Sequence, residues 1–348
     1  METENFTRSV LAWYDSGHRD LPWRHTHDAY RIWISEIMLQ QTRAETVISY
    51  YERFLARYPT VRDLAQAEEE DVLKIWEGLG YYSRARSLHK AAKIIVDQHG
   101  GHLPESVEAL RALPGIGAYT SGAIAAIAFG LPVAAVDGNV ERVLCRHDAF
   151  TQTVGTPSAR RQIEERAGRL VPADRPGAFA NAMMEMGATV CTPQNPACLI
   201  CPVRESCRGR ALGIAQDLPV KAKKKAPRVE KRCVLLVFAQ GRVLLVKRTE
   251  KLLGGLFVFP DLPGDPTHAQ MCAHMERLGV QTAYDMPLGH ARHVFSHLIW
   301  EMDLHALEAE CCAPVDGGVW VTAQQLDALP LPTAVKAAKE RAMERLKA

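Results

Sequence analysis

Four cysteines with short spacings lie just past the middle of the chain. Cys191, Cys198, Cys201 and Cys207 are separated by six, two and five residues. Thiols this close together are typical ligands of one metal centre. Zinc sites with four cysteines usually use two separate Cys-x2-Cys pairs, whereas this segment has one tight pair between wider gaps. The spacing therefore favours a [4Fe–4S] cluster, with a zinc site and unligated thiols as the alternatives.

One glutamate stands in a strongly apolar segment. Glu36 is the only charged residue from Ile32 through Thr42. If this segment is a helix, apolar neighbours surround the carboxyl group and desolvation raises its pKa, which makes it a usable general acid. The alternative is an ordinary surface glutamate at a gap in the apolar stripe.

A second carboxylate follows an apolar run and precedes a helical pattern. Asp137 comes after Leu131–Val136 and before Gly138-Asn139-Val140. It is placed to cap a helix, and backbone amides that bond a carboxylate keep it ionised near neutral pH. One protonated and one ionised carboxyl group are what glycosidic bond cleavage through an oxocarbenium-like state requires. The same logic extends to the N-glycosidic bond of a nucleotide.

The segment Leu113-Pro114-Gly115-Ile116-Gly117 lies between two predicted helices, 106–112 and 118–129. Gly115 and Gly117 permit a tight turn with exposed amides, ahead of a helix whose free N–H groups point outward. That geometry suits a DNA backbone phosphate. The alternative is an ordinary turn between two packed helices.

Helical periodicity dominates residues 1–212, and the pattern changes after a basic segment. We expect residues 213–231 to form a linker, because lysine and arginine dominate between Leu218 and Arg232. It is either a solvated tether or one that also contacts phosphates. Residues 232–348 are predicted to form a separate α+β domain. Its expected strands are 233–238, 242–247, 256–259 and 293–304, with a turn at 239–241, and its expected helices are 270–278 and 323–329.

Composition limits the classes of protein that this chain can belong to. It has 348 residues, 47% apolar and 24% charged, with a net charge of +2. No apolar run is long enough for a membrane span, and the first residues do not resemble a secretory signal. We therefore expect a reducing compartment and a local rather than global basic surface. The other cysteines are expected to be buried free thiols: Cys145, Cys233, Cys272, Cys311 and Cys312.

The hairpin, Asp137 and the cysteine segment together resemble the endonuclease III superfamily of DNA glycosylases, with its helix-hairpin-helix. Three segments are specifically similar to MutY-type adenine DNA glycosylases: Trp33–Thr42, Gly78–Arg86 and Val136–Val140. The resemblance implies a six-helix barrel at residues 23–130. It also implies an iron–sulfur domain built from residues 1–22 and 131–212.

The resemblance implies an activity as well as a fold. Such enzymes excise adenine opposite 8-oxoguanine, or less efficiently opposite guanine, from double-stranded DNA during base excision repair. The implied protein is a monomer of the bacterial-type cytoplasm, associated with the nucleoid and not with membranes. Bifunctional relatives carry a lysine just after the hairpin, where this chain has Tyr119. A monofunctional glycosylase is therefore expected, because a tyrosine forms no Schiff base.

The resemblance also implies a role for each residue in the catalytic part. Glu36 would protonate the base at N7, and Asp137 would stabilise or trap the sugar cation. Tyr119 would hydrogen-bond beside the sugar, Glu185 would assist Asp137, and Asn139 would orient the acid and the water.

Further residues are implied to contact the nucleic acid. Arg24 would lie at the adenine edge, while Gln41 and Tyr81 (in preference to Tyr82) would wedge into the base stack. Several other arginines are candidates for phosphate contacts or for simple surface positions: Arg84, Arg86, Arg204, Arg208 and Arg210.

The C-terminal part resembles the Nudix-like domain of the same family, most clearly at Gly254–Pro260. The Glu-rich metal helix of a working Nudix hydrolase is missing from the sequence. Phe295-Ser296-His297 matches the family motif that reads the lesion. Alternatively, Phe295 is a core residue and His297 its polar neighbour on a strand.

Two other functions fit parts of this sequence. One is a glycosylase for thymine or oxidised pyrimidines. The other is a DNA-binding or redox-sensing protein that carries a cluster without catalysis.

Overall fold

The computed structural model describes residues 2–222, 226–250 and 252–347. The chain divides into two compact units, Met1–Ala67 with Ser83–Lys223, and Glu68–Tyr82 with Lys224–Ala348. Within the described residues, no helix has the length and apolar character needed to cross a bilayer.

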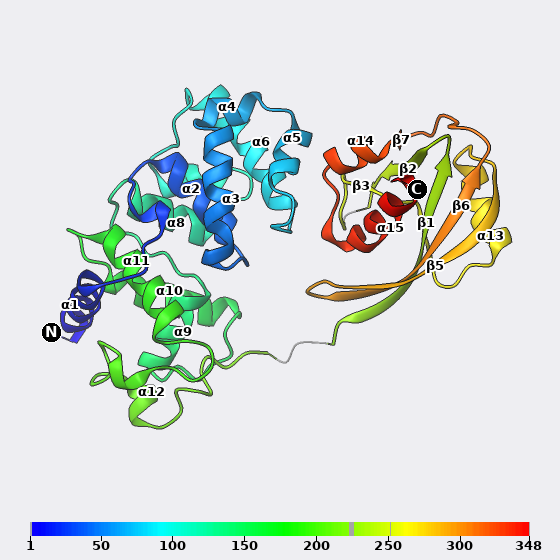
Figure 1. Cartoon of the computed structure of the whole chain (residues 1–348). Coiled ribbons are helices and arrows are strands. Elements are labelled where there is room, and N and C mark those ends of the chain that lie inside the picture. Colours follow the sequence, from blue (N-terminus) through cyan, green and yellow to red (C-terminus); the bar gives the residue numbers. More distant parts are fainter. Residues whose placement is uncertain (1, 223–225, 251, 348) are drawn as a thin grey trace. The chain divides into compact units, whose positions relative to one another are not determined.

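The first unit is helical (Figure 1). Its α-helices are α1 (Glu2–Ser16), α2 (Ala29–Leu39), α3 (Ala44–Arg57), α4 (Val61–Gln66), α6 (Ser83–Gln98), α7 (Val107–Ala112), α8 (Ala118–Ile127), α9 (Gly138–His147), α10 (Pro157–Leu170), α11 (Pro176–Thr189) and α12 (Arg208–Ala211). Short 3-10 turns span Pro22–Arg24 and Cys198–Ile200.

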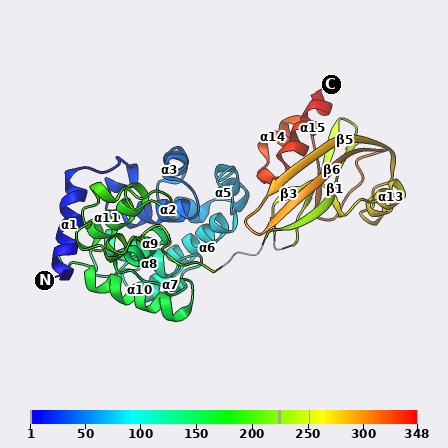
Figure 2. The ribbon, with the colours of Figure 1, turned by 90° about the horizontal axis from the view of Figure 1, so that it is seen from below.

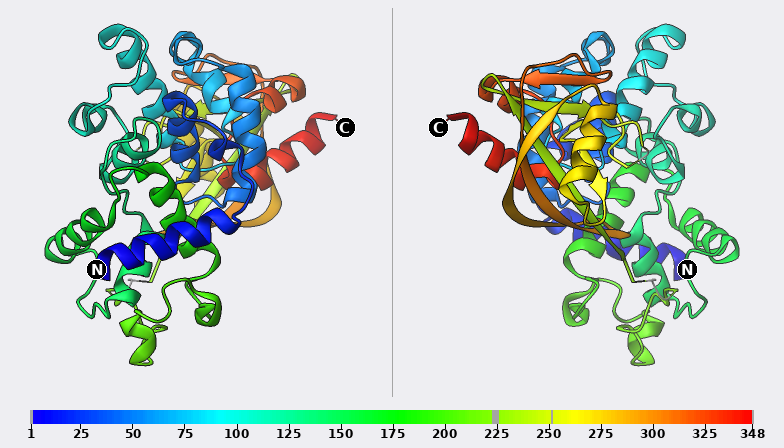
Figure 3. Two further views of the ribbon diagram at one scale, coloured as in Figure 1. Left: turned by 90° about the vertical axis from the view of Figure 1, so that its left-hand side faces the viewer. Right: turned by 90° about the vertical axis from the view of Figure 1, so that its right-hand side faces the viewer.

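The N-terminal helix packs far along the chain. α1 lies beside α10 and α11, as Figure 3 shows from two sides. Phe6 and Val10 of α1 share a core with Val140 of α9 and Met183 of α11. This packing brings the first residues of the chain to the helices that precede the cysteine segment.

Helix α2 places Glu36 inside the protein. Asp28 caps its N-terminus by accepting a hydrogen bond from the Arg31 amide at 3.0 Å. From Tyr30 to Met38, every residue except Arg31 is buried. A helix that is apolar on nearly all sides is a core helix, so its one carboxyl group is forced out of water.

Arg84 corrects one of our expectations. Its side chain is buried and donates to the carbonyl oxygens of Ile37 and Met38 at 2.9 Å, and to that of Gln40. The last carbonyls of a helix lack partners within the helix and favour a cation. Arg84 therefore caps α2, and is neither a surface residue nor a phosphate ligand.

The turn between α7 and α8 forms as predicted. Gly115 has φ of 79°, and a Cβ there would come within 2.7 Å of the Ser87 side chain. Gly117 immediately precedes α8, and both glycines are exposed while Ile116 between them is buried. The apolar residue anchors the turn and leaves the neighbouring amides at the surface.

The second unit contains a mixed seven-stranded sheet. Its elements are α5 (Glu69–Ile75), β1 (Arg228–Ala239), β2 (Arg242–Lys247), β3 (Phe257–Val258), β4 (Asp261–Pro263), α13 (His268–Arg277), β5 (Thr282–Val294), β6 (Leu298–Ala309), β7 (Gly318–Val321), α14 (Ala323–Ala328) and α15 (Lys336–Lys347). The main strand order is β3-β2-β1-β6-β5, with β4 on β1 and β7 on β2. Among the strand pairs described in this sheet, β1 and β6 are parallel and the others are antiparallel.

Helices cover both faces of this sheet. α13 and α15 lie on opposite sides of it (Figures 1 and 2). Along β1, Leu236 packs toward Ala338 of α15, whereas Leu235 packs toward Met275 of α13. This alternation explains the continuous apolar run in β1, because a strand covered on both faces has no polar side.

The predicted strand at 293–304 is wrong. The chain forms two strands there, β5 and β6, and it reverses at Phe295–His297, where the Phe295 amide donates to the Leu298 carbonyl at 2.8 Å. The alternating pattern continues through the turn, and Ser296-His297 lacks the glycine, proline or asparagine that usually marks one. The expected turn between β1 and β2 does form, with positive φ at Gln240 and Gly241.

The linker and the spare cysteines also differ from expectation. β1 already begins at Arg228, so the last residues of the predicted linker pair with β6. Residues 223–225 of that linker lie outside the described residues. Of the other cysteines, Cys145 and Cys233 are buried, whereas Cys311 is exposed and Cys272 and Cys312 are half-buried.

Candidate active site

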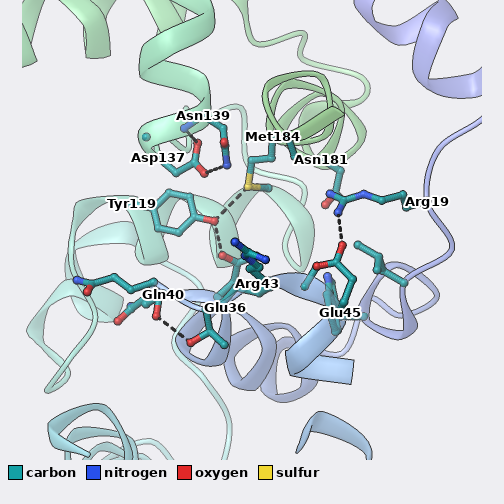
Figure 4. A pocket seen from close by; sticks show the side chains of 18 of the residues that line it. Arg19, Glu36, Gln40, Arg43, Glu45, Tyr119, Asp137, Asn139, Asn181 and Met184 are labelled. Carbon is teal, nitrogen blue, oxygen red and sulfur yellow. Dashed lines mark hydrogen bonds and ion pairs between the residues drawn. The ribbon is translucent and has the colours of Figure 1, made fainter. Parts of the chain in front are cut away.

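A cavity of about 900 Å3 opens in the first unit. Glu36 of α2 and Asp137 before α9 both line it, although they are far apart in the chain. Other lining residues come from the loop after α2 and from α8 and α11 (Figure 4). Among the predicted site residues, the cavity gathers Arg24, Glu36, Gln41, Tyr119, Asp137 and Asn139.

Glu36 is the buried acid that the sequence predicted. It is 3% exposed, and this burial raises its pKa to about 7. The hydrogen bond from Tyr119 and the charge of Arg24 oppose the rise, while the charge of Asp137 adds to it. Near neutral pH a substantial fraction of Glu36 therefore carries a proton.

Tyr119 lies between the two carboxyl groups (Figure 4). Its hydroxyl donates to Glu36 Oε2 at 2.5 Å and lies 3.1 Å from Met184 Sδ. Burial, reinforced by the charge of Glu36, raises the pKa of Tyr119 well above its usual value. The hydroxyl thus stays a donor, and it occupies one oxygen of Glu36 while leaving the other for a proton.

Asp137 is held by three hydrogen bonds. Its Oδ1 accepts from the amides of Asn139 at 2.9 Å and Val140 at 2.8 Å, and its Oδ2 accepts from Asn139 Nδ2 at 2.7 Å. Burial raises the pKa of Asp137 above its ordinary value, and these donors limit the rise because they stabilise the charged form. The Asp137 carboxylate therefore both caps α9 and lines the cavity.

Arg142 fixes the Asn139 amide, a role that the sequence analysis missed. Its Nη2 donates to Asn139 Oδ1 at 2.9 Å and to the Gly187 carbonyl at 2.7 Å. A Cβ at Gly187 would come within 2.5 Å of the Asn139 Cβ, so only glycine permits this close approach of α11 to α9. The sequence could have indicated this contact, because Arg142 follows Asn139 by three positions and the two residues therefore share one helix face.

Glu185, which was expected to assist Asp137, forms its side-chain hydrogen bonds with two arginines. Its carboxylate accepts from Arg19 Nε at 2.9 Å, from Arg19 Nη2 at 2.8 Å and from Arg24 Nη2 at 2.7 Å. Burial alone would raise the pKa of Glu185, but these arginine bonds outweigh it and hold the value at about 2. A carboxylate saturated by two guanidinium groups serves to position them.

Arg24 is consequently a fixed donor in the cavity wall. Its side chain is 7% exposed, and its Nη1 donates to the Arg19 carbonyl at 2.9 Å. The Arg24 Nε is buried and has no hydrogen-bond partner in the described structure. A buried donor without a partner is costly.

The two predicted wedge residues share an unusual backbone conformation. Gln41 has φ of 60° and Tyr81 has φ of 48°, and both side chains are exposed. Non-glycine residues adopt this region rarely, and such strain concentrates at functional sites. Gln41 borders the cavity of the first unit, whereas Tyr81 belongs to the second unit.

The four predicted ligand cysteines line one small pocket. No group of three or more His, Cys, Asp or Glu side chains within the described ranges is arranged to hold a single metal ion. A cluster needs a wider arrangement, because each thiolate binds a different iron atom. Arg146 braces the loop by donating to the carbonyls of Thr192 at 2.6 Å and Pro193 at 2.9 Å, and it lies 3.4 Å from Cys191 Sγ.

Family models match three parts of the chain. Residues 34–172 match the HhH-GPD superfamily of base excision DNA repair proteins, and residues 191–207 match the iron–sulfur binding domain of endonuclease III. Residues 233–341 match the NUDIX domain.

Curated relatives cover nearly the whole chain. An adenine DNA glycosylase of Homo sapiens is 37% identical, over 96% of this chain and 73% of the relative. One from Buchnera aphidicola of Schizaphis graminum is 34% identical, over 74% of each chain. This chain belongs to the adenine DNA glycosylase family.

Solved structures support the fold of the helical part. A thermostable thymine-DNA glycosylase is 30% identical, covers 61% of this chain and 97% of its own, and has a TM-score of 0.55. Endonuclease III in a trapped covalent complex with DNA is 23% identical, covers 60% of this chain and 95% of its own, and has a TM-score of 0.52.

Family membership confirms several expectations. The fold class is confirmed, with a helical glycosylase part and a C-terminal Nudix-like domain. The chain is an enzyme of base excision repair, which corrects the hypothesis of a cluster protein without catalysis. Its cofactor is a [4Fe–4S] cluster, and the pocket of four thiols braced by Arg146 fits that group.

The C-terminal part of this glycosylase has Phe295-Ser296-His297, the predicted lesion motif, at the tip of the β5–β6 hairpin. Ser296 and His297 are exposed, and Ser296 Oγ lies 3.3 Å from His297 Nδ1. Phe295 instead packs edge-on against Trp300, with ring centroids 5.0 Å apart. The only acid in α13 is Glu276, so that helix lacks the carboxylates of a metal-dependent Nudix hydrolase.

Proposed function

We propose that this enzyme is a monofunctional glycosylase that removes adenine paired with 8-oxoguanine, or with guanine, from double-stranded DNA. The observation that carries the proposal is the pairing of Glu36 and Asp137 in one cavity. Glu36 has a pKa of about 7, and Asp137 is bonded by three N–H donors. Their environments suit an acid and an anion, respectively.

The reaction begins when adenine is flipped out of the duplex into the cavity. Glu36 transfers its proton to N7 of the base, through the oxygen that Tyr119 does not occupy. The electrons of the C1′–N9 bond then move into the protonated base, and positive charge develops on the sugar. Asp137 stabilises this charge or traps it as a covalent adduct.

Other cavity residues position the reactants. Arg24 lines the cavity and lies at the adenine edge of the bound base. Asn139 holds Asp137 and orients the acid and the water that attacks C1′. Addition of that water and loss of its proton yield an abasic site and free adenine. Tyr119 has no amine, so no Schiff base forms and the strand stays intact.

DNA binding uses backbone amides, wedges and cations. The amides around Gly115 and Gly117 bind a backbone phosphate, and Gln41 and Tyr81 fill the stack left by the extruded base. Lys221, at the cavity edge, adds a positive charge from the basic segment. The enzyme acts as a monomer, in the cytoplasm of a bacterial-type cell beside the nucleoid.

Lesion choice belongs to the tip of the β5–β6 hairpin. Ser296 and His297 are exposed donors and acceptors, and they pair with the groups that distinguish 8-oxoguanine from guanine. Phe295 supports them through its contact with Trp300.

A panel of duplexes tests this proposal. Adenine opposite 8-oxoguanine, adenine opposite guanine and thymine opposite guanine are each treated with the enzyme and then with or without alkali. We expect alkali-dependent cleavage, fastest for adenine opposite 8-oxoguanine and absent for thymine. Cleavage confined to the thymine duplex supports a pyrimidine glycosylase instead, and cleavage without alkali contradicts the monofunctional assignment.

A further inference from the structure

The loop that carries Tyr81 has three residues with positive φ angles. Gly78, Gly80 and Tyr81 have φ of 98°, 72° and 48°. Glycine tolerates this region, but a tyrosine there is strained and persists only when its surroundings fix it. Tyr81 is 47% exposed, whereas Tyr82 beside it is buried. The strained residue is thus the one whose side chain faces outward.

A neighbouring segment of the second unit is bonded to this loop. Leu331 is buried, and its amide donates to Glu77 Oε1 at 3.2 Å. The carbonyl of Leu331 accepts from the hydroxyl of Tyr82 at 3.3 Å. The N–H and the carbonyl of Leu331 therefore bond to residues that precede and follow Tyr81 in the sequence.

A lysine ties the same segment from the helix before the loop. Lys74 Nζ donates to Glu77 Oε2 at 2.7 Å, to the Asp327 carbonyl at 2.8 Å and to the Leu329 carbonyl at 3.3 Å. Its charge and that of Glu77 compensate each other, so Glu77 is held in place to accept from Leu331. The bonds from Lys74 to Glu77 and to the Leu329 carbonyl are partly buried, which strengthens them relative to surface contacts.

The bonded segment is itself stiff. It reads Leu329-Pro330-Leu331-Pro332, here called the proline strap. Proline fixes φ and has no N–H, so the amide of Leu331 is the only backbone donor between Leu329 and Thr333. A rigid strap loses little entropy when it binds, and it transmits its position to the loop that it contacts.

We propose that Glu77 and the proline strap are positioning elements that hold Tyr81 in its strained conformation, ready to enter the base stack. The inference rests on the proposed wedge role of Tyr81. Glu77 acts through Tyr81 and does not touch the substrate. Losing the bonds from Leu331 and Lys74 lets the loop relax to an ordinary backbone conformation, and each extrusion of adenine must then first restore the strained one.

A double-mutant cycle in the full chain tests this. The target adenine is replaced by 2-aminopurine to follow its extrusion by fluorescence, and excision is measured on adenine in a single turnover. Glu77→Ala is expected to slow both about tenfold, the effect of losing the partly buried hydrogen bond from the Leu331 amide. Combined with Tyr81→Ala, it should add no further loss, because both changes then act on the same wedge.

Matched variants separate positioning from general damage. Glu70→Ala lies just before Glu77 and removes an exposed 3.4 Å pair with Lys247, so it should behave like the unaltered enzyme. Glu77→Gln keeps an acceptor for Leu331 and should recover most of the rate. Thermal unfolding checks that Glu77→Ala is folded. If it is not, Tyr82→Phe, which removes one hydroxyl, should show the same coupling with Tyr81→Ala, with a smaller loss of rate.

The outcomes are distinct. If Glu77→Ala lowers the excision rate by the same factor in the Tyr81→Ala background as in the unaltered enzyme, the positioning role is overturned. Extrusion of 2-aminopurine that is unchanged in Glu77→Ala overturns it as well. A normal rate for Tyr81→Ala instead overturns the wedge on which the inference rests. In both cases alkali-sensitive excision opposite 8-oxoguanine still stands as the test of the proposed activity.

Discussion

The catalytic cavity and the tip of the β5–β6 hairpin use polar groups in opposite ways. In the cavity, Glu36 and Asp137 are surrounded by protein, and their hydrogen bonds are already made. At the tip, Ser296 and His297 are exposed, and in the described part of the chain their side chains make one hydrogen bond, the 3.3 Å contact with each other. Chemistry needs groups whose pKa is set before the substrate arrives, whereas recognition needs groups whose bonds are still open.

This difference predicts how each region responds to substitution. A change in the cavity alters charge or proton affinity and should act on the rate of bond cleavage. A change at the tip removes bonds that form only with DNA and should act on the choice of the opposite base. The predictions below run from the largest expected effect to the smallest.

Asp137→Asn should reduce single-turnover excision by about a thousandfold or more, because it removes the anion that faces the developing sugar cation. Affinity for the mispaired duplex should remain, since the helix cap can still form. Glu141→Gln, on the same helix but outside the cavity lining, is the matched control. Excision by Asp137→Asn at a normal rate would show that the cavity is not preorganised for charge.

Glu36→Gln should make the folded protein more stable at high pH. The ordinary pKa of a glutamate is 4.5 and that of Glu36 in the fold is about 7, so the folded state binds the proton more tightly. Stability is therefore lost as pH rises from about 4.5 through 7, to a total of about 3 kcal/mol.

Denaturant unfolding at two pH values measures this. The variant and the unaltered enzyme should have similar free energies of unfolding near pH 4.5, and the variant should be more stable at pH 8. An equal difference at both values would mean that Glu36 titrates normally, and the contrast between a desolvated cavity and a solvated tip would disappear.

Cys198→Ser should lower iron content and weaken duplex affinity about tenfold or more, because one ligand of the cluster is lost. Cys311→Ser, at an exposed thiol outside the ligand pocket, should change neither. Iron analysis and the visible spectrum measure loading. Full iron content in Cys198→Ser would remove that residue from the ligand set.

Ser296→Ala with His297→Ala should reduce the preference for 8-oxoguanine over guanine by several-fold to about a hundredfold, the range for one or two lost hydrogen bonds. The rate on adenine opposite guanine should hardly change. Glu301→Gln, at a half-buried residue of β6, is the control. Unchanged discrimination would leave the tip a structural turn and confine recognition to other residues.

Local patterns sufficed for part of this site. Glu36 is isolated in an apolar helix, and Asp137 precedes a helix start, so burial and capping could both be predicted from neighbours in the chain. The cysteine spacing likewise indicated a cluster. These features depend on residues that are close in sequence.

Contacts between distant segments explain what could not be predicted. Arg84 caps α2 from another helix, and Glu185 binds Arg19 and Arg24 rather than Asp137, because tertiary packing decides which charges meet. The turn at Ser296-His297 lacked a turn residue, so its alternating pattern indicated one strand. The bonds of the proline strap to Glu77 join residues about 250 positions apart and leave no local signal.

The pH dependence of single-turnover adenine excision tests the central claim most directly, that a neutral Glu36 protonates the base beside an anionic Asp137. For the unaltered enzyme, the rate should fall as pH rises through about 7, where Glu36 loses its proton. Glu36→Gln should be slower by about a hundredfold or more and should lack this descending limb. A rate that is flat from pH 6 to 9, or a Glu36→Gln enzyme with the normal rate and profile, would contradict the account.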